Sequence, residues 1–194
     1  MRGSVLPPNS NIGHDTTIAG WSWAADTHSW LEPTCFYVIA LKAAGQGKNP
    51  RVRDGLRLIA DRLLPAGGCN YGNTQVLGQI LLPHLQPTGI AMMALAGTSV
   101  QDHRIEASLR YLASTLQNEQ SSPRTMSTAS LCFGLLGLTA HHRRPPAAGS
   151  WLEAATQREV QQELSFYKLG LLALASVENS VLGVPRVQSH GHAD

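Results

Sequence analysis

An internal repeat of about 54 residues constrains the fold of this chain more than any other feature. Glu32-Pro33-Thr34 begins an apolar segment that ends at Ala40-Leu41, and Gln86-Pro87-Thr88, 54 residues further on, begins another that ends at Ala94-Leu95. Proline is accepted in the first turn of a helix because its missing N–H would have no partner there. Each segment is followed by a glycine suited to end a helix, Gly45 or Gly97. Two equivalent helices, apolar nearly all round, are therefore predicted.

A second type of helix is predicted after each of these segments. Its apolar residues follow the spacing i, i+4, i+7 and i+11, which places them in one stripe. The first stripe comprises Val52, Leu56, Ile59 and Leu63, and the second, 53 residues later, comprises Ile105, Leu109, Leu112 and Leu116. A helix with one apolar stripe can face water on its other side, whereas a helix that is apolar all round has to be surrounded. The repeat therefore predicts two layers, one of inner and one of outer helices.

The pattern continues toward the C-terminus. A third inner helix is expected from about Ser127 to Leu138, and a fourth from Phe166 to Ala175. Between them, Ser150 and Glu153 have the spacing of a capping box, which predicts an outer helix from Ser150 to about Leu164. We therefore divide the chain into an irregular N-terminal segment (1–19), a helical repeat domain (20–177) and a flexible C-terminal tail (178–194).

The composition excludes several classes of protein. Lys and Arg number 15 against 13 Asp and Glu and form no basic block, so no nucleic-acid partner is expected. No run of about 18 apolar residues occurs, so no membrane span is expected. Three cysteines without a CxxC pair argue against a disulfide framework and favour a cytoplasmic location. Hydrophobic residues make up 43% of the chain and charged residues 14%, which suits helices buried on several sides or an open apolar cavity.

The turns before the inner helices resemble those of a known superfamily. Gly20-Trp21-Ser22-Trp23 and Leu64–Asn73, which precede the first two inner helices, resemble glycine-rich QW-type turns, and Ser122-Pro123 with Thr128–Leu131 resembles a third. Together they are similar to bacterial-type proteins of the squalene cyclase and protein prenyltransferase β-subunit superfamily, over roughly residues 20–177. The resemblance implies an all-α fold, an α/α-toroid of three to four helical hairpins. Such a toroid is incomplete, because the closed form of the family has five or six.

The same resemblance implies a function in handling isoprenoids. We expect an isoprenoid or another apolar small molecule to bind in the cavity of the toroid, without a cofactor. If the chain is an enzyme, it is a divergent terpene cyclase or a prenyltransferase-like protein, since the DxDD acid motif of class II cyclases is absent. The alternative is a non-catalytic scaffold or protein-interaction module that uses the open side of a partial toroid.

Candidate site residues lie at the beginnings of the inner helices, which the resemblance places near the cavity mouth. Asp26 and Glu32 are the candidate acid and base, although a carboxylate at the start of a helix more often interacts with its free N–H groups. The residues expected to contact a ligand are Trp23, Trp30, Tyr71 and Gln86. Aromatic rings at these positions could stabilise a cation through their π faces, or could simply pack the turns onto the helix ends.

No zinc site is expected. Prenyltransferases hold Zn²⁺ with Asp, Cys and His, and the resemblance would put the Asp two residues before Cys69, where this chain has Gly67. If a metal is bound, Cys69 is the residue expected to ligate it. Cys35 and Cys132 lie within apolar helices, where a free cysteine is ordinarily buried as a small hydrophobic residue. Cys69 also stands where the QW-type repeat has Trp, so one stacking contact should be lost there.

An incomplete toroid leaves apolar helices uncovered at its two ends, here the segments Thr34–Ala44 and Phe166–Ala175. At about 25 cal/mol per Å², leaving several hundred Å² of apolar surface in water costs on the order of 10 kcal/mol. That cost rivals the whole stability of a typical domain. We therefore expect a homo-oligomer, or a partner subunit that completes the toroid.

Overall fold

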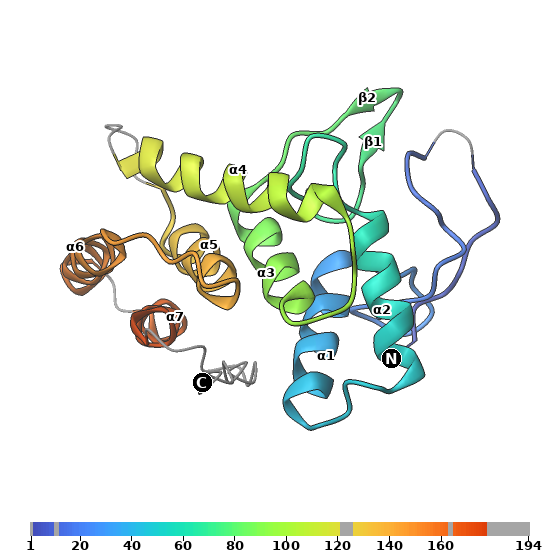
Figure 1. Ribbon diagram of the computed structural model, residues 1–194, viewed down its shortest axis with the longest axis horizontal. Coiled ribbons are helices and arrows are strands. Elements are labelled where there is room, and N and C mark those ends of the chain that lie inside the picture. Colours follow the sequence, from blue (N-terminus) through green and yellow to red (C-terminus); the bar gives the residue numbers. More distant parts are fainter. Residues whose placement is uncertain (1, 10–11, 121–125, 163–164, 178–194) are drawn as a thin grey trace, which may run out of the picture.

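The computed structural model describes residues 2–9, 12–120, 126–162 and 165–177 (Figure 1). Within these ranges the chain is mostly helical, which confirms the expected all-α class. The helices are α1 (Leu31–Ala43), α2 (Pro50–Asp61), α3 (Leu85–Leu95), α4 (His103–Gln120), α5 (Thr128–Ala140), α6 (Ala148–Val160) and α7 (Phe166–Ser176). One short hairpin, formed by β1 (Gln75–Val76) and β2 (Gln79–Ile80), lies between α2 and α3.

The odd-numbered helices form one row. α1 packs on α3, α3 on α5 and α5 on α7, and each even-numbered helix packs against the two odd-numbered helices that flank it in sequence. Helices α1 and α3 run parallel. At one end, the side chains of Glu32 and Gln86, in the first turns of the two helices, are hydrogen-bonded. At the other end, Lys42 Nζ of α1 donates to the carbonyl oxygens of Ala94 (2.9 Å), in the last turn of α3, and Ala96 (2.5 Å), just after it. These are the inner and outer helices that the repeat predicts.

Cationic and imidazole side chains gather at the C-terminal ends of the inner helices. The last turn of a helix leaves carbonyl groups without partners, and its dipole favours positive charge. His141 Nε2 lies 2.9 Å from the carbonyl oxygen of Met92 in α3, and Arg144 Nη1 donates to that of Ala175 in α7 (2.8 Å). Because His141 and Arg144 directly follow α5, the helices α3, α5 and α7 all end on the same side.

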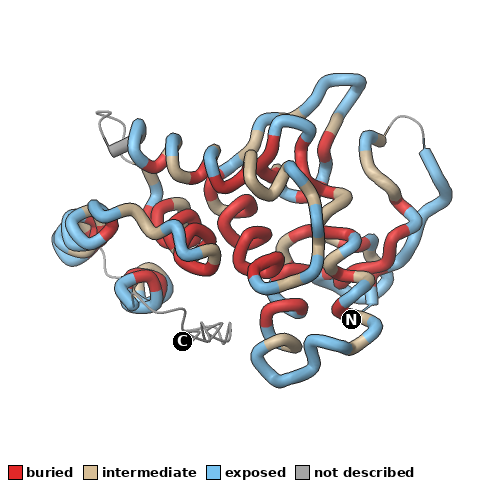
Figure 2. The backbone as a smooth tube through the Cα atoms, in the orientation of Figure 1, coloured by how far each residue is buried: buried red, intermediate tan, exposed pale blue. Residues whose placement is uncertain are grey.

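Helices α3 and α5 form the centre of the core (Figure 2). Nearly every residue of both helices is buried. Gly89 and Gly137 lie at their contact and let the two main chains approach closely, and Gly134 faces Leu116 of α4. The inner helices that were expected to be surrounded are therefore the two in the middle of the row.

The predicted outer stripes are buried at most of their positions. Val52, Ile59, Leu63, Leu109, Leu112 and Leu116 are at most 4% exposed, whereas Leu56 and Ile105 are half-buried. The predicted glycine caps are also confirmed, since Gly45 and Gly97 follow α1 and α3 with φ of 74° and 65°. An L-residue with a side chain is disfavoured in that left-handed region.

The predicted start of the third outer helix is wrong. α6 begins at Ala148, and the Ser150 hydroxyl donates to the Ala147 carbonyl (2.8 Å), so Ser150 lies inside the first turn and does not cap it. The helix starts earlier because the chain already turns after the prolines, where Ala148 N–H donates to the Pro145 carbonyl (3.0 Å). The helix also ends at Val160, earlier than the expected end near Leu164. The turn at Ser122-Pro123 and the tail 178–194 lie outside the described residues.

The turns before α1 and α3 are built in the same way. Trp21 N–H donates to Thr34 Oγ1 (2.9 Å), and Cys69 N–H donates to Thr88 Oγ1 (2.9 Å). Thr34 and Thr88 are the equivalent threonines of the two repeats. Cys69 thus occupies the place that Trp21 occupies in the first repeat, as the sequence suggests.

The residues of the outer helices that face Trp21 and Cys69 differ in size to match them. In the first repeat the Trp21 indole lies over Gly55, where an added Cβ would be 2.9 Å from the ring. In the second repeat the residue 53 positions after Gly55 is Ser108, whose hydroxyl accepts a hydrogen bond from Gly68 N–H (2.7 Å). A large ring over glycine is therefore replaced by a small thiol and a buried hydrogen bond.

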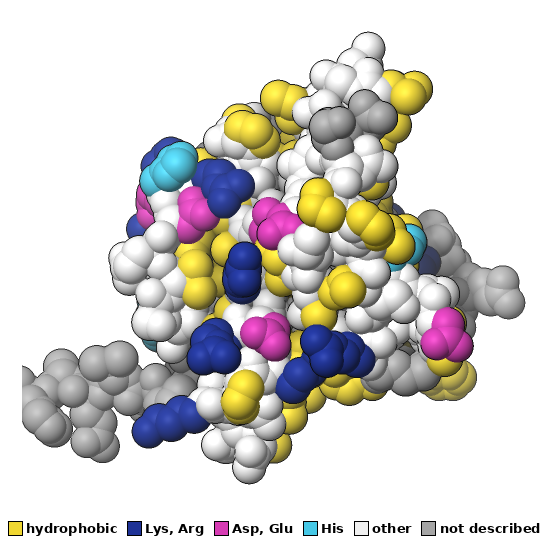
Figure 3. Space-filling view, turned by 90° about the vertical axis from the view of Figure 1, so that its right-hand side faces the viewer, with side chains coloured by type: hydrophobic (Ala, Val, Ile, Leu, Met, Phe, Trp, Pro, Cys, Tyr) yellow, Lys and Arg dark blue, Asp and Glu magenta, His cyan; other side chains and the backbone are white. Residues whose placement is uncertain are grey.

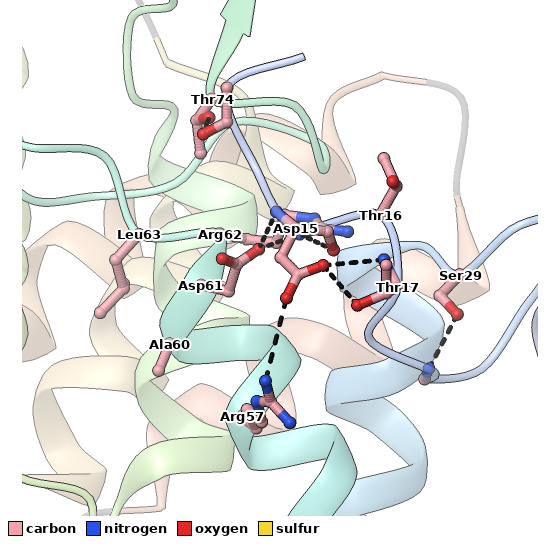
Figure 4. Close-up of polar contacts among 12 residues, drawn as sticks. Asp15, Thr16, Thr17, Ser29, Arg57, Ala60, Asp61, Arg62, Leu63 and Thr74 are labelled. Carbon is pink, nitrogen blue, oxygen red and sulfur yellow. Dashed lines mark hydrogen bonds and ion pairs between the residues drawn. The ribbon is translucent and has the colours of Figure 1, made fainter. Parts of the chain in front are cut away.

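The N-terminal segment is attached to α2 by polar contacts (Figure 4). Asp15 N–H donates to Asp61 Oδ2 (3.1 Å), and the Asp15 carboxylate lies 3.8 Å from Arg57 Nη2. Arg62, which is 4% exposed, pairs with Asp61 and donates to the Asp15 carbonyl (3.4 Å). These contacts fix the segment that leads into the first inner helix.

On the face in Figure 3, Lys and Arg lie close to Asp and Glu, with apolar side chains between them. None of the helices among the described residues has both the length and the hydropathy needed to cross a membrane.

Candidate functional site

The inner helices line an apolar cavity of about 460 Å³. All four of them contribute side chains, and the loop before α1 adds one more. The wall consists of Trp23, Glu32, Phe36, Ile39, Met93, Phe133, Leu136, Tyr167, Leu171 and Leu174. Small-molecule sites usually enclose about 300–1,000 Å³ and are mostly apolar, with a few polar groups that orient the ligand. This cavity has that size and composition.

Aromatic rings supply much of the wall. The rings of Phe36 in α1 and Phe133 in α5 have centroids 6.4 Å apart, so residues nearly 100 positions apart in sequence meet across the cavity. Trp23 and Tyr167 are 59% and 61% exposed, which shows that the cavity is open to solvent at these rings. Each ring offers a large apolar surface and a π face to a bound molecule.

Glu32 is the one charged residue among the described residues of this wall. It lies in the first turn of α1 and is half-buried. Burial raises its pKa, and the hydrogen bond with the Gln86 side chain opposes that rise. Burial also raises the pKa of Tyr167, and the charge of Glu32 adds to the effect, so the phenol and the carboxyl lie within electrostatic range of each other. The Glu32 carboxyl and the Tyr167 phenol can together donate to and accept from a ligand hydroxyl, whereas Gln86, a predicted contact, is not among the residues of the wall.

Asp26, the other candidate acid, lies outside the cavity. It is exposed in a turn with φ of 60° and does not contribute to the wall. The N-cap residue of α1 is Trp30, whose side chain makes no capping hydrogen bond. The structure therefore brings Glu32 together with Gln86 and Tyr167, and leaves Asp26 apart from them.

Trp30 and Tyr71 also lie outside the wall. The ring centroids of Trp30 and His28 are 4.8 Å apart, and those of Tyr71 and His84 are 5.3 Å apart. Both aromatic residues thus contact histidines of the turns that precede α1 and α3. Among the aromatic candidates, Trp23 is the one that the structure places at the cavity.

Cys69 is fully buried, and burial raises the pKa of its thiol to about 12. A metal ligand has to be a thiolate, which such a group does not form at neutral pH without a metal ion to compensate. Cys35 and Cys132 are buried free thiols as well. Among the residues that the structure describes, His, Cys, Asp and Glu form no group of three that could hold a metal ion.

Most residues of the cavity wall were not predicted from the sequence. Phe36 and Phe133 lie in helices that are apolar nearly all round, so no stripe separates residues of the wall from residues of the core. Tyr167, however, could have been found. It is the second residue of α7, as Glu32 is of α1 and Gln86 is of α3. A polar residue at the second position of α1, α3 and α7 is therefore a signal for this end of the row, although α5 has Ala129 there.

Comparison of the chain with protein-family models, with curated proteins and with solved structures gives no match.

Proposed function

We propose that this chain is a partial α/α-toroid that binds an isoprenoid alcohol, or a similar apolar molecule with one hydroxyl group, in the cavity among α1, α3, α5 and α7. The observation that carries the proposal is the convergence of all four inner helices on one apolar wall. Burying a hydrocarbon chain against such a wall is favourable in proportion to the apolar area removed from water.

The polar end of the cavity determines the head group. Glu32 is hydrogen-bonded with Gln86, and no Lys, Arg or His among the residues that the structure describes contributes to the wall. A diphosphate would have no counter-ion there and would meet a carboxylate instead. A hydroxyl group can donate to Glu32 and can accept from the Tyr167 phenol, both of which belong to the wall. An isoprenoid alcohol therefore fits this cavity better than an isoprenoid diphosphate does.

Binding of farnesol, measured by displacement of a neutral apolar dye such as Nile red, tests the proposal. We expect farnesol to bind at least about tenfold more tightly than farnesyl diphosphate, because the diphosphate loses more than 1.4 kcal/mol in desolvation and repulsion. Leu136→Trp, which fills the cavity from α5, should abolish binding of both dye and farnesol.

The matched control is Val160→Trp, because Val160 is 59% exposed at the end of α6 and does not contribute to the wall. Circular dichroism and urea denaturation should show both variants folded. Unchanged farnesol binding by a folded Leu136→Trp variant, or equal affinity for alcohol and diphosphate, would contradict the proposal.

A second candidate function, that of an interaction module, is supported by α7. Phe166 and Tyr167 are 87% and 61% exposed, and Val177, just after the helix, is 44% exposed. With Leu171 and Leu174 they border a shallow apolar hollow of about 600 Å³. An exposed patch of this kind is typical of protein contacts. This surface is the one that a further helix of a partner or of a second copy would cover in a longer row.

A further inference from the structure

The β1–β2 hairpin carries an apolar surface that the folded chain does not cover. Exposed fractions are 44% for Val76, 94% for Leu77, 62% for Ile80 and 78% for Leu82. The hairpin projects from the helical body, so these side chains lie on a protrusion and not in a groove (Figure 1). Single exposed apolar residues are ordinary, but a group of four on one projecting hairpin indicates a contact surface.

The turn of the hairpin strengthens this interpretation. Leu77 and Gly78 both have positive φ, 49° and 78°, which is the geometry of a two-residue type I′ turn. Asn, Asp or Gly normally precedes the glycine in such a turn, since bulky side chains are disfavoured in the left-handed region. Leu77 is thus strained and almost fully exposed, and it makes no contribution to the core. Its presence at the tip is explained by a contact outside the chain.

The hairpin itself carries no formal charge, and Asp15, Asp61 and Arg62 lie near Thr74, at its base (Figure 4). The sequence has no Asp, Glu, Lys or Arg from Leu63 to Gln101, and none from Gly3 to Gly13. Gly13, at the end of the second of these segments, lies at the base of the hairpin, because Thr74 Oγ1 donates to the Gly13 carbonyl (2.7 Å). In Figure 3 the charged side chains of this face lie below the projection.

The main chain of the hairpin is largely satisfied within itself. Gln75 pairs with Ile80 and Val76 with Gln79, and Leu81 N–H donates to the Thr74 carbonyl (3.0 Å). A segment that leaves water has to satisfy its backbone groups internally, which a hairpin does more completely than an irregular loop. Because its backbone groups are paired, the free energy needed to transfer this tip from water to an apolar medium is low.

We propose that the β1–β2 hairpin docks on a lipid membrane surface, with Leu77 and Ile80 inserted among the acyl chains below the head groups. A protrusion with an apolar tip and no charge suits a fluid, uncharged layer, whereas a protein partner would require a complementary groove. The absence of Lys and Arg around the tip means that docking does not depend on anionic lipid. The proposal is independent of the ligand proposed for the cavity.

Co-sedimentation of the full chain with vesicles of phosphatidylcholine alone tests this docking. The decisive variant is Leu77→Asn/Ile80→Thr, which replaces two apolar side chains and restores the common Asn-Gly turn with a β-branched neighbour. This variant should fold at least as well as the wild type and bind vesicles more weakly by on the order of tenfold or more. The matched control, Val160→Thr at the end of α6, replaces an apolar side chain that is about as exposed as Ile80 (59% and 62%) and should bind like the wild type.

Wild-type binding should be the same at low and at high salt and should not increase when phosphatidylserine is added. Three results would overturn the proposal. The wild type could stay in the supernatant, in which case the exposed hairpin serves some other contact. The hairpin variant could bind as well as the wild type. Binding could also require anionic lipid and be lost in high salt, which would identify an electrostatic site elsewhere.

Discussion

Gly89 of α3 lies directly against the main chain of α5 at Phe133. A Cβ atom built on Gly89 would be 2.1 Å from the Phe133 carbonyl oxygen and 2.9 Å from the next main-chain nitrogen, that of Gly134. No change of rotamer can relieve a contact with the main chain. The two helices at the centre of the core therefore depend on the absence of a side chain at this position.

Gly89→Ala should lower the free energy of unfolding by about 3 kcal/mol or more, because α3 and α5 have to separate. Gly170→Ala is a matched control, since Gly170 is also the fifth residue of an inner helix but has no atom within 4 Å of an added Cβ. That variant should gain about 0.5–1 kcal/mol from better helix propensity. Urea denaturation measures both, and equal stability of the two variants would refute the close packing.

Lys42 should stabilise the row of inner helices from its C-terminal side. Its Nζ donates to the Ala94 and Ala96 carbonyl oxygens of the neighbouring helix. Lys42→Met leaves these partly buried acceptors without a donor, so the free energy of unfolding should fall by about 1–3 kcal/mol. Lys48→Met, at an exposed position of the following loop, should change it by less than about 0.5 kcal/mol. A similar small effect of both variants would show that the contact contributes little.

Stability should decrease as the pH falls from about 6.5 toward 4. Burial, and then the charge of Arg62, lower the pKa of His14 from 6.5 to about 4. Between these values the unfolded chain binds a proton at His14 that the folded chain does not, so acidification favours unfolding. The ring is only half-buried, so solvent screening reduces the effect to on the order of 1 kcal/mol.

Urea denaturation at pH 7 and pH 4.5 measures this loss of stability. His14→Gln should reduce the difference between the two pH values, and His103→Gln, whose ring is 88% exposed, should not. The pKa values of Asp15 and Asp102 are also lowered, but they affect stability in a different pH range. The stabilisation that these carboxylates provide is present above the ordinary carboxyl pKa of 3.8 and is lost only below it.

The chain should self-associate or bind a partner through α7. At micromolar concentration, sedimentation velocity should show a species larger than a monomer, since Phe166 and Val177 leave an apolar edge in water. Phe166→Asp/Val177→Asp should shift the chain to monomer, whereas Leu77→Asn/Ile80→Thr should not, because the hairpin belongs to a different surface. A sharply melting wild-type monomer that binds no apolar dye would contradict both the association and the open cavity.

Metal analysis should find well under one equivalent of zinc in the purified chain. The Cys69 thiol, with its pKa raised to about 12, should also react slowly with Ellman's reagent in the native state and rapidly in urea. Stoichiometric zinc that is lost on Cys69→Ala would contradict this prediction and would favour the transferase interpretation.

The sequence alone determined the parts of this structure that depend on local pattern. Pro33, Thr34 and the glycine at 45 mark one inner helix, and their equivalents mark the next, because helix starts, stops and apolar stripes are set by residues within one or two turns of each other. The same local rules failed where two signals competed. The prolines before α6 started that helix ahead of Ser150, and the hairpin went unpredicted because Leu77-Gly78 lacks the usual Asn-Gly signal.

Only the tertiary structure decided which residues form the cavity and its polar end. Glu32 and Gln86 are second residues of helices 54 positions apart, and they meet because α1 and α3 run parallel and in register. Phe36 of α1 and Phe133 of α5 come near each other because both helices pack on α3. In helices apolar nearly all round, periodicity cannot tell the side that faces a neighbouring helix from the side that faces a cavity. That distinction depends on how the row of helices is arranged, which is a long-range property of packing and not of any single segment.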